Sequence, residues 1–195
     1  AVKNSDLVII ATPISSFEKV LNSIAGNLKV GSILTDTCSV KTGVSKIFEK
    51  KNLKNSTCIP GHPVAGIENS GPEAGFADLF KNRWTILTPN KKIDGQAIKK
   101  LSSFWESMGS KVKIMTDEDH DKILTFTSHL PHVIAYNIVK TSMSNDASVK
   151  DDIIKYSAGG LRDFTRIAAS DPVMWRDIFI DNSACLLYTS PSPRD

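Results

Sequence analysis

The sequence predicts an α/β fold in which a parallel sheet is followed by an all-helical part. Up to about residue 115, short apolar runs alternate with amphipathic segments, which is the pattern of βαβ units. From Asp117 onward, apolar residues recur at helical spacing only. We therefore expect an α/β domain over residues 1–115 and a helical domain over residues 116–184. Residues 185–195 leave the helical pattern and end rich in proline and serine, so we expect a tail that is disordered or foreign to the protein.

Five short apolar runs predict the strands, and they lie at residues 7–10, 32–35, 57–60, 84–88 and 112–115. The first contains only Leu, Val and Ile, which is typical of a strand buried on both faces. Ser15 and Glu18 have the spacing of a capping box and predict the start of the first helix. The helix before the last strand is predicted by one apolar stripe, formed by Ile98, Leu101, Trp105 and Met108.

The helical part contains its own start signals. An acidic triplet at residues 117–119 favours a helix N-terminus. Helical spacing then continues to about Ser142, and Pro131 within it should kink the helix. Asp171 followed by Pro172 predicts another helix, because a capping residue precedes proline at the first helical position.

Composition excludes several classes of protein. The net charge of +3 is too small for a nucleic-acid surface, and no Lys/Arg-rich run occurs. No apolar stretch approaches the ~18 residues that span a membrane. The three cysteines are an odd number without metal-type spacing, so we expect a reducing compartment, the cytoplasm, and no disulfide framework.

Three loops follow the ends of predicted strands, at residues 12–13, 36–41 and 61–66. Ligands of open parallel sheets bind at that edge, so we expect these loops to line a pocket. Each loop taken singly is also compatible with a tight turn.

His62 in the third loop is a candidate general base, because an imidazole with a pKa near 6.5 accepts a proton at neutral pH. Ser39 would orient it if the two neighbouring loops face each other. The alternatives are a surface or hydrogen-bonding role for His62 and an N-cap role for Ser39.

His129 and His132 lie three residues apart on one helical face, where they would form a polar wall suited to an anion. The alternative is a core histidine satisfied by hydrogen bonds. No third ligand stands at a suitable spacing, so a metal site is not expected. His120 has acidic neighbours and is expected to be solvated.

An arginine cluster follows in residues 159–166, where Asp163 and Arg166 stand at i and i+3. Arg166 could form a guanidinium fork for a carboxylate, held in place by Asp163. The alternative is a surface salt bridge worth less than ~1 kcal/mol. Together with His62, this cluster suits a small anionic substrate that must lose a proton.

Four ordered motifs resemble the prephenate dehydrogenases, a group that includes the arogenate and cyclohexadienyl dehydrogenases of tyrosine biosynthesis. The motifs are DTCSVK at 36–41, HPVAG at 62–66 continuing to Ser70 and Gly71, SHLPH at 128–132, and GGLRD at 159–163 continuing to DPVMW at 171–175. The resemblance runs from about Asp6 to Asp181. It implies a Rossmann-like domain that holds NAD and a helical domain that forms a homodimer. It also implies oxidative decarboxylation of prephenate, without a metal.

The resemblance assigns roles to individual residues. His62 would take the proton of the 4-hydroxyl group, and Ser39 would orient His62 and touch the cofactor. Arg166 with His132 would bind a substrate carboxylate. The supporting residues would be His129, Asp163 and Ser170 beside that pair, Glu68 at the pocket entrance, and Thr12 and Pro13 beside the nicotinamide ribose.

The chain departs from the family pattern at both ends. The glycine-rich first βαβ unit is absent, so we expect a truncated Rossmann-like domain, an incomplete helical domain, and activity only in the full-length parent. Prephenate and arogenate, and NAD and NADP, stay open as alternatives. Two other functions are also open: a β-hydroxyacid-type dehydrogenase with a catalytic lysine, and a non-catalytic dimerising module.

Overall fold

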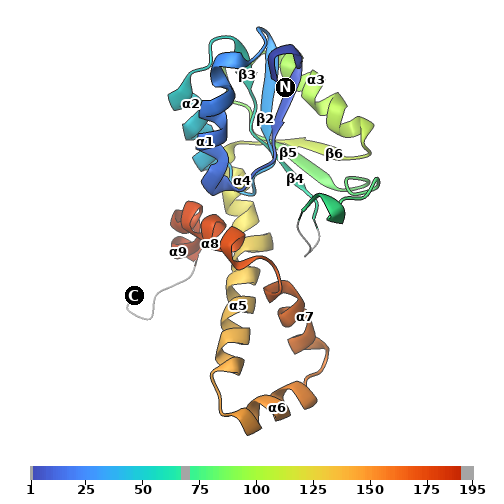
Figure 1. Ribbon diagram of the computed structural model, residues 1–195, viewed down its shortest axis with the longest axis vertical. Coiled ribbons are helices and arrows are strands. Elements are labelled where there is room, and N and C mark those ends of the chain that lie inside the picture. The colour runs from blue at the N-terminus through green and yellow to red at the C-terminus, as the bar shows by residue number, and fades with distance from the viewer. Residues whose placement is uncertain (1, 67–70, 190–195) are drawn as a thin grey trace.

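The computed structural model describes residues 2–66 and 71–189 and confirms the α/β fold with a helical C-terminal part (Figure 1). Strands β1 (Leu7–Ile10), β2 (Ser32–Asp36) and β3 (Ser56–Cys58) form a parallel sheet in that order. Strands β4 (Gly61–Val64), β5 (Trp84–Leu87) and β6 (Lys111–Ile114) form a second sheet. There β5 and β6 are parallel, whereas β4 is antiparallel to β5.

Strand β4 corrects one prediction, because residues 61–66 were expected to form a loop. Pro60 and Pro63 limit what the local sequence can show, since proline is unusual inside a sheet. Pairing with β5, more than twenty residues further along the chain, decides the conformation.

Helices cover both faces of the strands (Figure 1). Helices α1 (Ile14–Ile24) and α2 (Thr42–Lys51) pack on one face, and α3 (Gly95–Ser107) packs on the other. Successive residues of β2 show the alternation: Leu34 belongs to the core under α1 and α2, and Ile33 to the core under α3. Both faces of β2 are therefore buried, as its five buried residues show.

Seven helical segments make up the C-terminal part as far as Thr189, the last residue that the structure describes. They are α4 (Asp117–Leu124), a π-helical turn (Thr125–His129), α5 (Leu130–Met143), α6 (Ala147–Lys155), α7 (Gly159–Ala168), α8 (Pro172–Asp181) and α9 (Ser183–Thr189). Pro131 stands at the start of α5, directly after the π-helical turn. The expected disturbance of the helix therefore takes the form of a wide turn before the proline. Short 3-10 segments occur at Val2–Asn4, Ala25–Asn27 and Pro72–Ala74.

Helix α9 overturns part of the predicted tail. Residues 185–189 continue a helix, and Leu186 is buried. The helical pattern was missed there because a helix of seven residues shows barely two turns of periodicity. Residues 190–195 lie outside the described part of the chain. Within the described part, no helix has the length and apolarity needed to cross a bilayer.

Two of the three predicted helix starts are confirmed, and one is wrong. The acidic triplet forms the first turn of α4, which begins at Asp117. Asp171 caps α8 by accepting hydrogen bonds from Val173 N at 2.8 Å and Met174 N at 3.1 Å. The capping box at Ser15 does not form, because α1 begins two residues earlier than that cap requires, and Pro13 occupies the N-cap position without a side-chain bond.

Thr116 supplies a cap whose loss can be measured. Its Oγ1 accepts from Asp119 N at 3.1 Å at the start of α4, and its side chain is exposed. Thr116→Ala should lower the free energy of unfolding by about 1 kcal/mol in urea denaturation, whereas Thr116→Ser should retain most of it. Equal losses in the two variants would contradict a capping role.

Candidate active site

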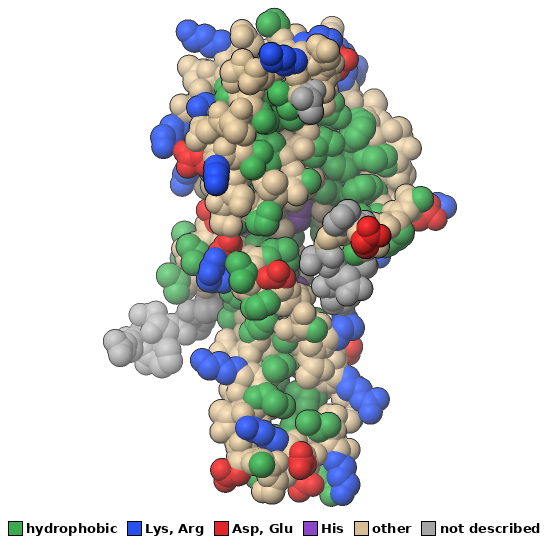
Figure 2. Space-filling view, in the orientation of Figure 1, with side chains coloured by type: hydrophobic (Ala, Val, Ile, Leu, Met, Phe, Trp, Pro, Cys, Tyr) green, Lys and Arg blue, Asp and Glu red, His purple; other side chains and the backbone are tan. Residues whose placement is uncertain are grey.

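A cavity of about 750 Å³ lies between the carboxyl ends of the strands and the helical part. Figure 2 shows the hollow between the two parts, with histidine side chains in it. Its walls come from the loops after β1 and β2, from β4, and from helices of the C-terminal part. It brings together seven of the predicted site residues: Thr12, Pro13, Ser39, His62, His132, Arg166 and Ser170. Both parts of the chain therefore contribute to one site.

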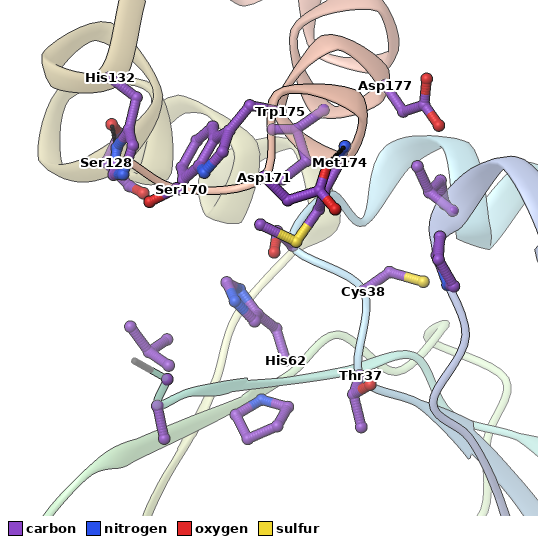
Figure 3. A pocket seen from close by; sticks show the side chains of 18 of the residues that line it. Thr37, Cys38, His62, Ser128, His132, Ser170, Asp171, Met174, Trp175 and Asp177 are labelled. Atoms are coloured by element: carbon purple, nitrogen blue, oxygen red, sulfur yellow. Dashed lines mark hydrogen bonds between the residues drawn. The ribbon is translucent and has the colours of Figure 1, made fainter. Parts of the chain in front are cut away.

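His62 lies on β4 and points from the sheet toward the helical wall, as Figure 3 shows. Its side chain is buried, and its Nδ1 lies 2.8 Å from Nε2 of His120. Burial lowers the pKa of His62 well below its ordinary value, and the nearby charges of His120, Lys41 and His129 lower it further. The ring is therefore neutral at pH 7 and can accept a proton. The sequence had suggested Ser39 as the residue that orients His62. In the structure the partner of His62 Nδ1 is His120.

His120 is fully buried, so the expectation that it is solvated is wrong. Its Nδ1 lies 2.8 Å from Oδ1 of Asp121. The signal that could have found it is the helical stripe of Leu124 with residues 120 and 121, which all face inward on α4. Sequence reasoning missed this pair because acidic neighbours suggested an exposed face.

Asp121 joins the helical part to α2. Its carboxylate accepts from Lys41 N at 2.8 Å and from Thr42 N at 2.9 Å, at the start of that helix. Burial alone would raise the pKa of Asp121, but the hydrogen bonds from His120, Thr42 and Lys41 lower it overall. Asp121 is thus an ionised helix cap, and the alternative role of Ser39 as that cap is not observed.

A buried ion pair between Lys41 and Asp36 supports the loop after β2. Lys41 Nζ contacts Asp36 Oδ2 and donates to Gly61 O at 2.6 Å, while Asp36 accepts from Cys38 N and Gly61 N. A side chain at Gly61 would stand 2.9 Å from Thr35 Oγ1, so close packing explains this glycine better than a turn does. The network holds the loop that contains Ser39 beside the strand that carries His62.

His132 and Arg166 lie on the opposite wall of the cavity. The His132 ring stacks on Trp175 with centroids 3.5 Å apart, and its Nδ1 donates to Ser128 O at 2.8 Å. Burial lowers the pKa of His132, the bond to Ser128 opposes that shift, and the positive charge of Arg166 adds to it. Arg166 and His132 line the same cavity. Figure 3 shows Ser170 and Trp175 on this same wall.

His129 is a core histidine, which was the alternative to a place in the wall of the cavity. It is fully buried, it does not line the cavity, and Asn182 Nδ2 donates to its Nδ1 at 2.8 Å. Residues three apart differ by about 60° around a helix, so one can face the core while the other faces the cavity. The Ser39 backbone opposes part of the fall in the pKa of His129. Within the described structure, however, His129 Nε2 has no hydrogen-bond partner of good geometry.

The buried His129 makes stability depend on pH. Burial lowers its pKa to about 4, against 6.5 in the unfolded chain, so between these values the unfolded state binds more protons. The free energy of unfolding should therefore fall by roughly 3 kcal/mol as the pH drops from 7 to 4 through this group. Urea titrations of the protein and of His129→Gln isolate the contribution, because the variant should lose this slope between pH 6.5 and 4. An unchanged slope would show that other groups cause it.

The remaining predicted site residues are Ser170, Asp163 and Glu68. Ser170 lines the cavity, its Oγ donates to Ile167 O at 2.9 Å, and its carbonyl accepts from Tyr136 Oη. Asp163 is exposed on α7 and is not part of the cavity wall. Glu68 lies outside the described residues.

Comparison with known proteins covers nearly the whole chain. Residues 1–114 match a family model described as the nucleotide-binding domain of prephenate dehydrogenase, and residues 116–189 match the dimerization domain of the same family. A cyclohexadienyl dehydrogenase of Zymomonas mobilis is 43% identical over 187 residues, which are 96% of this chain and 64% of the relative. A prephenate dehydrogenase of Bacillus subtilis is 34% identical over 95% of this chain and 50% of its own length. The chain thus spans less than two thirds of these relatives.

Solved structures show the same similarity. Prephenate dehydrogenase from A. aeolicus, in complex with hydroxyphenyl propionate and NAD+, superposes with a TM-score of 0.85 at 37% identity, over 94% of this chain and 63% of that one. Synechocystis arogenate dehydrogenase superposes with a TM-score of 0.79 at 26% identity, over 96% and 66% of the two chains.

Proposed function

Because the chain belongs to the prephenate dehydrogenase family, we propose that it carries the catalytic cavity of a dehydrogenase that converts prephenate to 4-hydroxyphenylpyruvate with NAD. The chain covers 64% of the Zymomonas relative, so the activity is assigned to a protein of that full length. The observation that carries the proposal is one cavity that is lined by His62 from the sheet and by His132 and Arg166 from the helical part.

The residues at the end of β1 fit a nicotinamide cofactor. Thr12 and Pro13 line the cavity, and Thr12 Oγ1 is buried without a hydrogen-bond partner in the described structure. A buried hydroxyl of this kind is costly unless a ligand satisfies it. We assign Thr12, Pro13 and Ser39 to cofactor binding. Bound NAD supplies the acceptor for the hydride that leaves C4 of the substrate ring.

His62 performs the proton step. Its neutral ring accepts the proton of the 4-hydroxyl group as that carbon is oxidised, CO2 leaves C1, and the ring becomes aromatic. Aromatisation favours the products strongly, so the protein mainly needs to align the substrate and supply a base. The burial that lowers the pKa of His62 keeps this base unprotonated in the resting state.

Arg166 and His132 bind a substrate carboxylate in this proposal. The guanidinium supplies charge-assisted hydrogen bonds, and stacking on Trp175 holds the His132 ring in place. Ser170 borders the same space. His129 supports this wall from the core, and Glu68 and Asp163 keep supporting roles only as family expectations.

Two features of the whole protein follow from the domain matches. We propose that residues up to about 115 form the nucleotide-binding part and that the helical part after residue 116 joins two copies. Arogenate is the second candidate substrate, because a relative at 43% identity is named a cyclohexadienyl dehydrogenase. Prephenate and arogenate differ by a keto or an amino group on the side chain.

The test is a rate comparison on the full-length protein with prephenate and arogenate, each with NAD and NADP. Formation of the reduced cofactor with prephenate and NAD supports the proposal, and activity with arogenate alone would replace the substrate. The 195-residue chain assayed beside it should be inactive. Absence of reduced cofactor in every combination would refute dehydrogenase function.

A further inference from the structure

Three buried side chains connect the cavity to the start of α2. His62 Nδ1 lies 2.8 Å from His120 Nε2, and His120 Nδ1 lies 2.8 Å from Asp121 Oδ1. His120 is 0% exposed and Asp121 is 2% exposed, so water does not compete for these contacts. The chain of contacts crosses from β4 in the sheet to α4 in the helical part.

An ionised Asp121 carboxylate can only accept hydrogen bonds, and this constrains the protons on both histidines. The Asp121 carboxylate accepts from the backbone N–H groups of Lys41 and Thr42 as well as from His120, so it is ionised and acts as an acceptor only. His120 must therefore carry its proton on Nδ1. A neutral His120 then presents the lone pair of Nε2 to His62.

The proton on the His62 ring depends on the state of His120 Nε2. When His120 is neutral, its Nε2 accepts, and the shared contact requires the proton to stand on His62 Nδ1, whereas an imidazolium at His120 would donate from Nε2 and place the His62 proton on Nε2. With His120 neutral, Nε2 of His62 is unprotonated and is the ring nitrogen left for a ligand in the cavity that His62 lines. The opposite tautomer would place an N–H where a base is required.

We propose that His120, anchored by Asp121, is a positioning residue that holds His62 in the tautomer with a free Nε2 toward the cavity. The catalytic meaning of this tautomer rests on the proposed function, whereas the tautomer itself is a property of the folded chain. His120 also stands between His62 and the Asp121 carboxylate. The titratable groups near enough to influence His62 electrostatically are His120, Lys41 and His129, of which Lys41 is paired with Asp36.

The direct test is nitrogen-15 NMR of the chain labelled in its four histidines, at neutral pH, with the His62 signals assigned from His62→Asn. We expect His62 and His120 each to show a protonated Nδ1 and an unprotonated Nε2. A protonated Nε2 on His62 would overturn the proposal.

Two substitutions then separate positioning from packing. His120→Gln places an amide near the former Nε2, and its oxygen can still accept from His62, whereas His120→Leu fills the space without an acceptor. In the full-length protein we expect His120→Leu to lower kcat about 10²- to 10⁴-fold, because a catalytic histidine in the wrong tautomer loses the contribution of general acid–base catalysis, which has that range. His120→Gln should recover most of that loss and keep the His62 tautomer in the NMR spectrum.

The outcomes are distinct. Equal losses in both variants, with the His62 tautomer unchanged, would show a packing role and overturn the proposal, as would full activity in His120→Leu. If the unsubstituted full-length protein forms no reduced cofactor, the proposed function fails while the NMR result still decides the tautomer.

Discussion

Replacing His62 with asparagine should lower kcat/KM for prephenate by two to four orders of magnitude in the full-length protein, because the general base is lost. Asparagine is the sharpest choice, since its amide nitrogen lies near the former Nδ1 and can keep donating to His120. The buried network is thereby retained while the proton acceptor disappears. Steady-state rates of reduced-cofactor formation provide the measurement.

Thermal unfolding supplies the control for this variant. The melting temperature of His62→Asn should remain close to that of the unsubstituted protein, so a loss of rate cannot be attributed to unfolding. A dehydrogenase of the β-hydroxyacid type, which relies on a lysine, would be barely affected by the substitution. Turnover within a few-fold of the original would therefore favour that alternative and remove His62 from the mechanism.

Arg166→Met should raise KM for prephenate about 10- to 150-fold with a smaller change in kcat, because hydrogen bonds to a charged group contribute roughly 1.5–3 kcal/mol. The long apolar side chain of methionine preserves most of the packing volume. Initial rates over a range of prephenate concentrations measure the effect. The increase should shrink at high salt, since part of the attraction is exposed to solvent.

Arg162→Met is the matched control for charge. Arg162 stands one turn earlier on α7 and lines a separate groove of about 160 Å³ between α5, α6 and α7. It loses the same charge from the same helix without changing the cavity wall, so KM should stay nearly constant. Similar increases in KM for both variants would indicate a general electrostatic effect and contradict a specific carboxylate contact.

The strands show which structural features local sequence patterns can predict. Runs of apolar residues located β1, β2 and β5 to within a residue or two, because strands buried in a parallel sheet are rich in Val, Ile and Leu. The pattern could not show that β4 pairs antiparallel with β5, since that pairing joins residues such as His62 and Ile86, which are far apart in sequence. The same reason explains why the loop prediction for His62 was wrong.

The histidines show which features of the candidate site could not be predicted from the sequence. Spacing placed His129 and His132 on one side of a helix, but only the packed structure separates the first into the core and the second into the cavity. His120 was missed because its partners are a histidine 58 residues away and a carboxylate that caps another helix. A polar side chain is buried or exposed according to the partners that tertiary contacts supply.

The sequence by itself determined the α/β class, the edge of the sheet where a ligand binds, and the motifs that resemble one enzyme family. Apolar periodicity and local turn chemistry suffice for these, because they act over a few residues. Only the tertiary structure decided which histidine meets which partner and which arginine lines the cavity. Those contacts join groups from β4, α4 and α7, and their energies depend on burial that no local pattern contains.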